Sequence, residues 1–244
     1  MGEQRLSVVD IFKIGVGPSS SHTLGPWRAA QQCLARWTSS PGVAGLERIE
    51  VHLYGSLAKT GRGHGTDVAV IAGLIGADPE TCDIDAVRTE VAAVLEQQHV
   101  RLADGADVEV AILFHPQESL PSHPNGLTFR GRWADAHEHV GTYYSVGGGF
   151  VVCDGDDDDE GRPAPVVLPF PIDTAADLLH WCDRSGSSVS GVVRANEAAW
   201  RAPSQTEAYL ANLWEAMRAS MFRGCHTPGV LPGGLHVRRR AADF

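Results

Sequence analysis

Residues 15–26, which read Gly-Val-Gly-Pro-Ser-Ser-Ser-His-Thr-Leu-Gly-Pro, constrain the fold of this chain more than any other stretch. The glycines and prolines at both ends favour an unusual backbone path, because glycine tolerates conformations that other residues avoid and proline fixes one dihedral angle. Between them stand three consecutive serines, His22 and Thr23. Segments that build a hydrophobic core do not have this composition. We therefore interpret the stretch as a rigid loop that directs hydrogen-bonding groups toward a small polar ligand.

A helix is expected directly after this loop, because apolar residues recur every three to four positions over residues 26–37. If the helix starts just after Ser21 or Thr23, either hydroxyl can cap it. The backbone amides of the loop would then lie at a helix N-terminus, which favours a carboxylate or another anion.

Two further stretches combine glycine with polar groups. Residues 46–54 alternate like a half-buried strand and lead into a second loop, residues 55–67, in which His64 stands between two glycines. Later, Ser145 is followed closely by Gly147, Gly148 and Gly149 inside a strand-like run. Three glycines weaken a strand, but they allow another backbone or a ligand to approach closely. Taken alone, the triple glycine favours a structural role.

The order of the elements predicts an α+β chain. We expect a small mixed or antiparallel sheet with packed helices over residues 1–165, followed by a helical extension and connector over residues 166–244. The expected strands cover residues 46–54, 108–114, 127–133 and 138–144, and the expected helices of the extension cover residues 173–182, 189–200 and 206–221.

Composition excludes several classes of protein. The net charge of −10 argues against nucleic acid as a partner, because nucleic-acid binding relies on clustered Lys and Arg. The sequence shows neither a bilayer-length apolar run nor a signal peptide, so we expect no membrane partner and a cytoplasmic location. The five cysteines are scattered without a Cys-x-x-Cys pair, so we expect no disulfide framework and no metal ligands within this chain. The acidic run at residues 154–160 is typical of a solvated loop.

Two histidines are candidates for proton transfer. His22 follows three serines and His64 lies between glycines, so neither occupies an apolar face. An imidazole titrates near neutral pH and is a natural general acid or base. A serine nucleophile is not supported, because the Gly-x-Ser-x-Gly elbow is absent, and a phosphate-binding P-loop motif is absent as well. A glycine-rich turn that carries a structural histidine remains the alternative.

Taken together, these stretches resemble the bacterial iron–sulfur L-serine dehydratases, also called L-serine ammonia-lyases. The similarity runs in order along essentially the whole chain. The sequence of residues 15–26 resembles the single-chain form of the family more than the form with a separate β chain. The residues that carry it are 10–23, 54–57, 63–67, 143–150, 190–191, 196–197 and 228–233.

The resemblance implies a reaction in which the enzyme removes the α-proton of L-serine and expels its β-hydroxyl, giving pyruvate and ammonia. It also implies a [4Fe–4S] cluster as Lewis acid for the hydroxyl, without pyridoxal phosphate. His22 and His64 would be the acid/base pair; the residues leave open which takes the α-proton, and we favour His64. The residues that would hold or closely surround the substrate are Ser19, Ser20, Ser21, Thr23, Ser145, Gly147, Gly148 and Gly149.

In that family, cysteines of a C-terminal helical domain hold the cluster, and this chain ends at Phe244, where that domain would begin. The resemblance therefore implies a β domain with its connector and a cluster-bearing domain as partner, in cis or in trans. A fragment, a truncated reading frame and one half of a split enzyme all fit this pattern. The rival hypotheses are a stand-alone binding or regulatory domain for an amino or hydroxy acid, and a non-catalytic remnant. The sequence is compatible with a homodimer but does not determine the oligomeric state.

Overall fold

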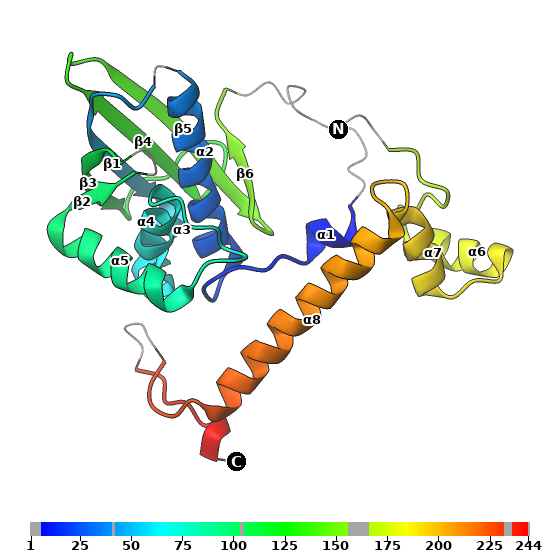
Figure 1. Ribbon diagram of the computed structural model, residues 1–244. Helices are drawn as coiled ribbons and strands as arrows, with labels where there is room; N and C mark the ends of the chain where they lie inside the picture. Colours follow the sequence, from blue (N-terminus) through cyan, green and yellow to red (C-terminus); the bar gives the residue numbers. More distant parts are fainter. Residues whose placement is uncertain (1–5, 41, 103–104, 156–165, 232–235, 244) are drawn as a thin grey trace. The chain divides into compact units, whose positions relative to one another are not determined.

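The computed structural model describes residues 6–40, 42–102, 105–155, 166–231 and 236–243 (Figure 1). It divides into two compact units, which we call the sheet unit and the helical unit. The sheet unit comprises Ile14–Asp156 and Gly229–Arg239, and the helical unit comprises Met1–Lys13, Asp157–Pro228 and Arg240–Phe244. We call residues 15–26 the glycine–serine loop. The segment that precedes it, up to Lys13, groups with the helices from the second half of the chain. The boundary expected at residue 165 and residues 156–160 of the acidic run lie outside the described residues.

The sheet unit contains a six-stranded sheet in the order β2-β3-β1-β4-β5-β6. Strand β1 pairs in parallel with β3 on one side and antiparallel with β4 on the other, and the remaining neighbours pair antiparallel. The prediction of an α+β fold with a small mixed sheet is therefore confirmed. The strands are β1 (Leu46–Tyr54), β2 (His99–Arg101), β3 (Asp107–His115), β4 (Gly126–Trp133), β5 (Glu138–Gly147) and β6 (Phe150–Cys153).

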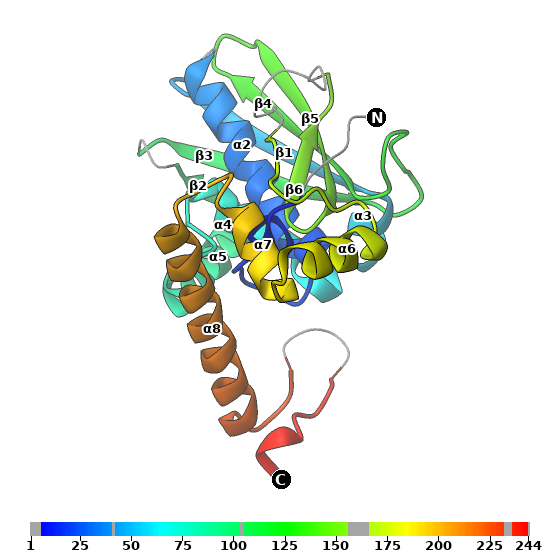
Figure 2. The same ribbon diagram turned by 90° about the vertical axis from the view of Figure 1, so that its right-hand side faces the viewer.

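The core lies between the sheet and its helices. Ile49, Val51 and Leu53 alternate along β1 and are fully buried, as the period of two predicts. Helix α2 lies along this face of the sheet with α4 beside it (Figures 1 and 2). The two helices approach so closely that a Cβ on Gly73 would lie 2.4 Å from the carbonyl oxygen of Trp27. The helices of this unit are α2 (Gly25–Ser39), α3 (Gly55–His64), α4 (Thr66–Leu74) and α5 (Ile84–Gln97).

The other face of β1 is polar. His52 Nδ1 lies 2.9 Å from His115 Nε2 on the parallel neighbour β3, and the two rings stack. Burial lowers the pKa of His52, and the neighbouring His115 lowers it further. The lowered pKa keeps the His52 ring neutral near pH 7.

Buried polar groups link the parts of the helical unit. Glu197 is 3% exposed; it accepts hydrogen bonds from the Ser7 hydroxyl and the Val8 amide, and it pairs with Arg201. The helices are α1 (Val8–Ile11), α6 (Ala175–Ser185), α7 (Val189–Glu197), α8 (Pro203–His226) and the 3₁₀ turn η2 (Ala241–Asp243). The three helices predicted for the extension are confirmed. Within the described ranges, every helix is too short or too polar to cross a bilayer.

Candidate active site

The glycine–serine loop ends in a π-helical turn, η1 (Ser20–Leu24), that runs directly into α2. The amide of Gly25 donates to the carbonyl of Ser20, five residues earlier. The prediction that Ser21 or Thr23 caps the helix is wrong, because no side chain caps α2 and the wide turn precedes it. Turns of this kind occur frequently at functional sites. This one places His22 on the side of the loop that meets α3.

Both ring nitrogens of His22 are engaged. Nδ1 lies 3.0 Å from Ser21 Oγ, and Nε2 lies 3.1 Å from Ser56 Oγ and 3.0 Å from Thr60 Oγ1. The Thr66 hydroxyl donates to the His22 carbonyl at 2.7 Å, which fixes the backbone as well. Burial lowers the pKa of His22, and the neighbouring His64 lowers it further. His22 is therefore held as a neutral ring among hydroxyls.

The prediction of a second loop is wrong for residues 55–64, because these residues form helix α3. Gly55 and Ser56 donate their backbone amides to the carbonyls of Glu118 and Pro124, and these contacts fix the start of a helix that its glycines disfavour. Residues four apart share one face of a helix. Ser56, Thr60 and His64 therefore all lie toward His22.

His64 closes this face. Its ring centroid lies 4.8 Å from that of His22, and its Nδ1 lies 2.9 Å from the carbonyl oxygen of Thr60. A carbonyl can only accept a hydrogen bond, so Nδ1 carries the proton and Nε2 of the neutral ring keeps its lone pair. The pair is asymmetric: His22 is hydrogen-bonded at both nitrogens, whereas Nε2 of His64 forms no hydrogen bond with the described residues.

Ser145 reaches the same region from β5. Its side chain is fully buried, and its Oγ has no hydrogen-bond partner among the described residues. A Cβ on Gly25 would lie 1.9 Å from this oxygen, so the missing side chain of Gly25 leaves room for it. A buried hydroxyl without a partner carries a desolvation penalty that a bound ligand can relieve.

Gly147 ends β5, and Gly148 and Gly149 form the turn that leads to β6. Gly147, Gly148 and Gly149 have φ values of 100°, 59° and 77°, a region that other residues rarely adopt. A Cβ on Gly149 would lie 2.6 Å from Leu24 Cδ2, so this turn packs directly on η1. At Gly147 nothing lies within 4 Å of the added atom.

The remaining predicted residues belong to the loop itself. Ser20 is exposed, Ser19 and Ser21 are half-buried with their hydroxyls 3.3 Å apart, and Thr23 is buried. The Thr23 hydroxyl donates to the Ser19 carbonyl and thus closes the loop on itself. Sequence reasoning missed Ser56, Thr60 and Thr66. The spacing of four between Ser56, Thr60 and His64 is the signal that could have found the first two.

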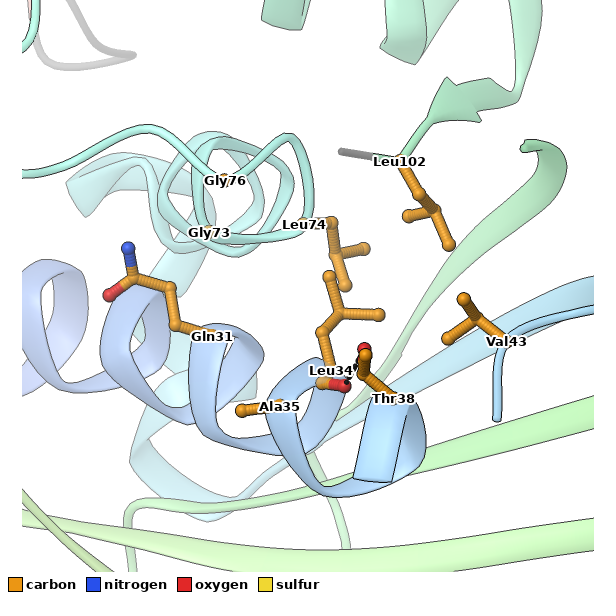
Figure 3. A pocket seen from close by; sticks show the side chains of 9 residues that line it. All are labelled: Gln31, Leu34, Ala35, Thr38, Val43, Gly73, Leu74, Gly76 and Leu102. Carbon is orange, nitrogen blue, oxygen red and sulfur yellow. Dashed lines mark hydrogen bonds between the residues drawn. The ribbon is translucent and has the colours of Figure 1, made fainter. Parts of the chain in front are cut away.

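A separate hollow of about 450 Å³ lies between α2, α4 and the end of β2, and it shares no lining residue with this site (Figure 3). Its polar side chains, Gln31 and Thr38, donate to the backbone carbonyls of Ala77 and Leu34. The rest of its lining is apolar or glycine, so the hollow does not offer the chemistry of the histidine pair.

Comparison with known proteins decides the family. Residues 7–156 match the family model described as serine dehydratase beta chain. This chain belongs to that family. L-serine dehydratase 2 of Escherichia coli K12 is 42% identical over 97% of this chain, and the L-serine dehydratase of Streptomyces coelicolor is 40% identical over 98%. The L-serine dehydratase of Haemophilus influenzae is 38% identical over 98%. These alignments cover 53–54% of each relative, so the chain spans about half the length of the curated relatives it matches.

Membership of the serine dehydratase family fits an iron–sulfur cofactor in general, but the described residues of this chain do not fit a cluster. They contain no group of three His, Cys, Asp or Glu side chains that could hold a metal ion. Cys33 and Cys153 are buried, and burial raises the pKa of the Cys33 thiol, which disfavours the thiolate that ligation requires.

Proposed function

We propose that this chain is the substrate-side β domain of an L-serine ammonia-lyase, which converts L-serine to pyruvate and ammonia. The observation that carries the proposal is the meeting of His22 and His64 among the hydroxyls of η1 and α3. The family of the chain supports the same reaction.

His64 is the proposed base for the α-proton. Its Nε2 keeps a lone pair because Nδ1 donates to the Thr60 carbonyl. His22 is the proposed partner, which holds and orients a substrate hydroxyl through the hydrogen-bonded set that includes Ser56. Its lowered pKa keeps the ring neutral near pH 7, so it does not repel a protonated His64.

The serines are the proposed substrate ligands. Ser19, Ser20 and Ser21 with the amides that begin η1 would bind the carboxylate, because a helix start favours an anion. The unpartnered Ser145 hydroxyl would complete the site, and the close turn of Gly147, Gly148 and Gly149 would shield it. Thr23 would act indirectly, by closing the loop.

Departure of the β-hydroxyl is assigned to no residue of this chain. We propose that another domain, in cis or in trans, would hold a [4Fe–4S] cluster, which would supply a Lewis acid for this hydroxyl without pyridoxal phosphate. A cytoplasmic location and a homodimer are compatible with the proposal, which includes no nucleic-acid or membrane partner.

Two measurements test the function. Calorimetry of the purified chain should show binding of L-serine but not of D-serine, and the chain alone, without iron, should form no pyruvate.

A chimera with the half of Escherichia coli L-serine dehydratase 2 that this chain does not match should form pyruvate. His64→Gln should slow that chimera about 10²–10⁴-fold, as loss of a general base typically does. Activity within about threefold of the unsubstituted chimera would remove His64 from this role. Serine binding without chimera activity would instead indicate a regulatory domain.

A further inference from the structure

Pro124 and Asn125, two consecutive residues outside the proposed site, form hydrogen bonds to both α3 and β5, which carry residues of that site. The carbonyl of Pro124 accepts from the amide of Ser56 at 2.9 Å, at the start of α3. The carbonyl of Asn125 accepts from the amide of Ser145 at 3.0 Å, and the Asn125 carboxamide donates to the Ser145 carbonyl at 3.2 Å. Residues 124–125 thus contact both the element that touches His22 and the end of β5.

The position of Ser145 depends on these contacts because regular pairing ends there. The pairing of β4 with β5 ends at Gly126 and Tyr144, one residue before Ser145. On the β6 side the register shifts between Ser145 and Gly147. At the next pair of residues, Asn125 and Ser145, one backbone bond remains, and the Asn125 carboxamide replaces the backbone amide as the N–H donor to the Ser145 carbonyl.

The loop that carries Asn125 is itself fixed against α3. The Glu118 carbonyl accepts from the Gly55 amide at 2.8 Å, and a Cβ on Gly55 would lie 2.3 Å from the Pro124 carbonyl oxygen. The Asn125 amide donates to His123 Nδ1 at 3.1 Å. Because the loop has little room to move on α3, a displacement at Asn125 is passed to both Ser145 and Ser56.

We propose that Asn125 is a positioning residue that sets the placement of Ser145 relative to Ser56 and His22. This inference rests on the proposed function in one respect only, namely that Ser145 and His22 act on the same ligand. A displacement of about 1 Å in such a site can cost on the order of 10²-fold in rate, so the position of the buried Ser145 hydroxyl matters more than its mere presence.

The test compares Asn125→Ala with Asn196→Ala in the full chain. Asn196 is a matched control in the helical unit, because its carboxamide holds the backbone of Phe170 by two bonds of 3.0 and 2.7 Å. Both variants should lower the unfolding midpoint in urea. Asn125→Ala should also weaken L-serine binding at least tenfold by calorimetry, whereas Asn196→Ala should stay within twofold of the unsubstituted chain.

Amide hydrogen exchange provides a readout that does not need serine. In Asn125→Ala the amides of Ser145 and Ser56 should both exchange at least tenfold faster, while Asn196→Ala leaves them unchanged. Faster exchange at Ser145 alone, or equal serine affinity in the two variants, would overturn the proposal.

If the unsubstituted chain binds no serine, the proposed function fails, and hydrogen exchange alone decides whether Asn125 positions Ser145. If Asn125→Ala does not fold, the isosteric Asn125→Asp replaces it, and unfolding of both would overturn a positioning role.

Discussion

The Nδ1 atom of His64 lies 2.9 Å from the carbonyl oxygen of Thr60, one turn earlier on the same helix. The helix backbone therefore sets the tautomer of this ring, and no acidic side chain of the described residues pairs with it. His22, 4.8 Å away between ring centroids, is instead fixed by three hydroxyls. Two histidines in contact thus have different chemistry, because one is surrounded by donors and acceptors and the other keeps a free lone pair.

His64→Gln is expected to raise the pKa of His22. Burial, the larger cause of the lowered pKa, remains, but the repulsion from a protonated His64 is lost. NMR titration of the His22 ring protons measures this change. His115→Gln is the control, because it changes the surroundings of His52 and leaves those of His22 intact. An unchanged His22 pKa in His64→Gln would show that the two rings do not interact electrostatically.

Acid should destabilise the sheet unit through its neutral histidines. His22 and His52 have folded-state pKa values below the ordinary value of 6.5. A group with a lowered pKa binds protons more readily in the unfolded state, so its contribution to stability is complete above about pH 6.5 and is lost as the pH falls through the folded value. Urea midpoints between pH 8 and pH 5 test this. His52→Gln should reduce the loss on acidification, and an equal loss in both proteins would contradict this role of His52.

Gly25→Ala and Gly63→Ala should have opposite effects on stability. The new methyl at residue 25 would lie 1.9 Å from Ser145 Oγ in a buried site, and overpacking of this kind costs about 1–3 kcal/mol. Gly63 lies inside α3 with nothing within 4 Å, so alanine there should stabilise by about 0.5–1 kcal/mol. Urea unfolding measures both. Serine binding should be lost only in Gly25→Ala, and its retention there would place the ligand away from Ser145.

Gly147→Ala and Gly149→Ala should separate backbone strain from packing. Both residues have positive φ, which costs a side chain about 1–2 kcal/mol. Only at Gly149 would the added carbon also meet another residue, 2.6 Å from Leu24 Cδ2. We expect Gly149→Ala to be the more destabilising in thermal unfolding. Equal losses would mean that Leu24 moves aside without cost.

Glu197→Gln should destabilise the helical unit by about 3–5 kcal/mol, because it leaves Arg201 without its buried carboxylate partner. Glu215→Gln, which alters the exposed ion pair with Arg218, should stay within about 0.5 kcal/mol of the unsubstituted chain. Urea unfolding followed by the fluorescence of Trp200 and Trp214 compares them. Similar losses would show that the network around Glu197 contributes nothing beyond a surface pair.

The sequence predicts the strands of the sheet better than it predicts the local backbone around the candidate site. Alternation along β1 and the polar glycine-rich stretches are visible because burial and turn chemistry act on neighbouring residues. The start of α3 is not visible, because Gly55 and Ser56 are fixed by carbonyls of Glu118 and Pro124, about sixty residues away. Local propensity favours a loop there, and a tertiary contact outweighs it.

The same dependence on contacts between distant residues explains why the sequence did not reveal Ser56 and Thr60 as site residues. Ser56 and Thr60 look like ordinary loop residues until residues 55–64 are known to be helical, after which their spacing places both beside His22. The capping role expected of Ser21 or Thr23 is wrong for a related reason, since nothing in a run of serines signals a π-helical turn.

That π-helical turn has a consequence for how the loop can change during evolution. A turn closed by a bond from residue 25 to residue 20 contains one residue more than an α-helical turn. Deleting one serine would let α2 extend backward as an ordinary α-helix. The same deletion would shift the part of the loop that precedes it by one residue, about 100° around the helix axis, relative to His22 and α2. Single-residue deletions among these serines should therefore be tolerated by the fold and eliminated by selection on activity, whereas substitutions that keep the length leave the register between the serines and His22 unchanged.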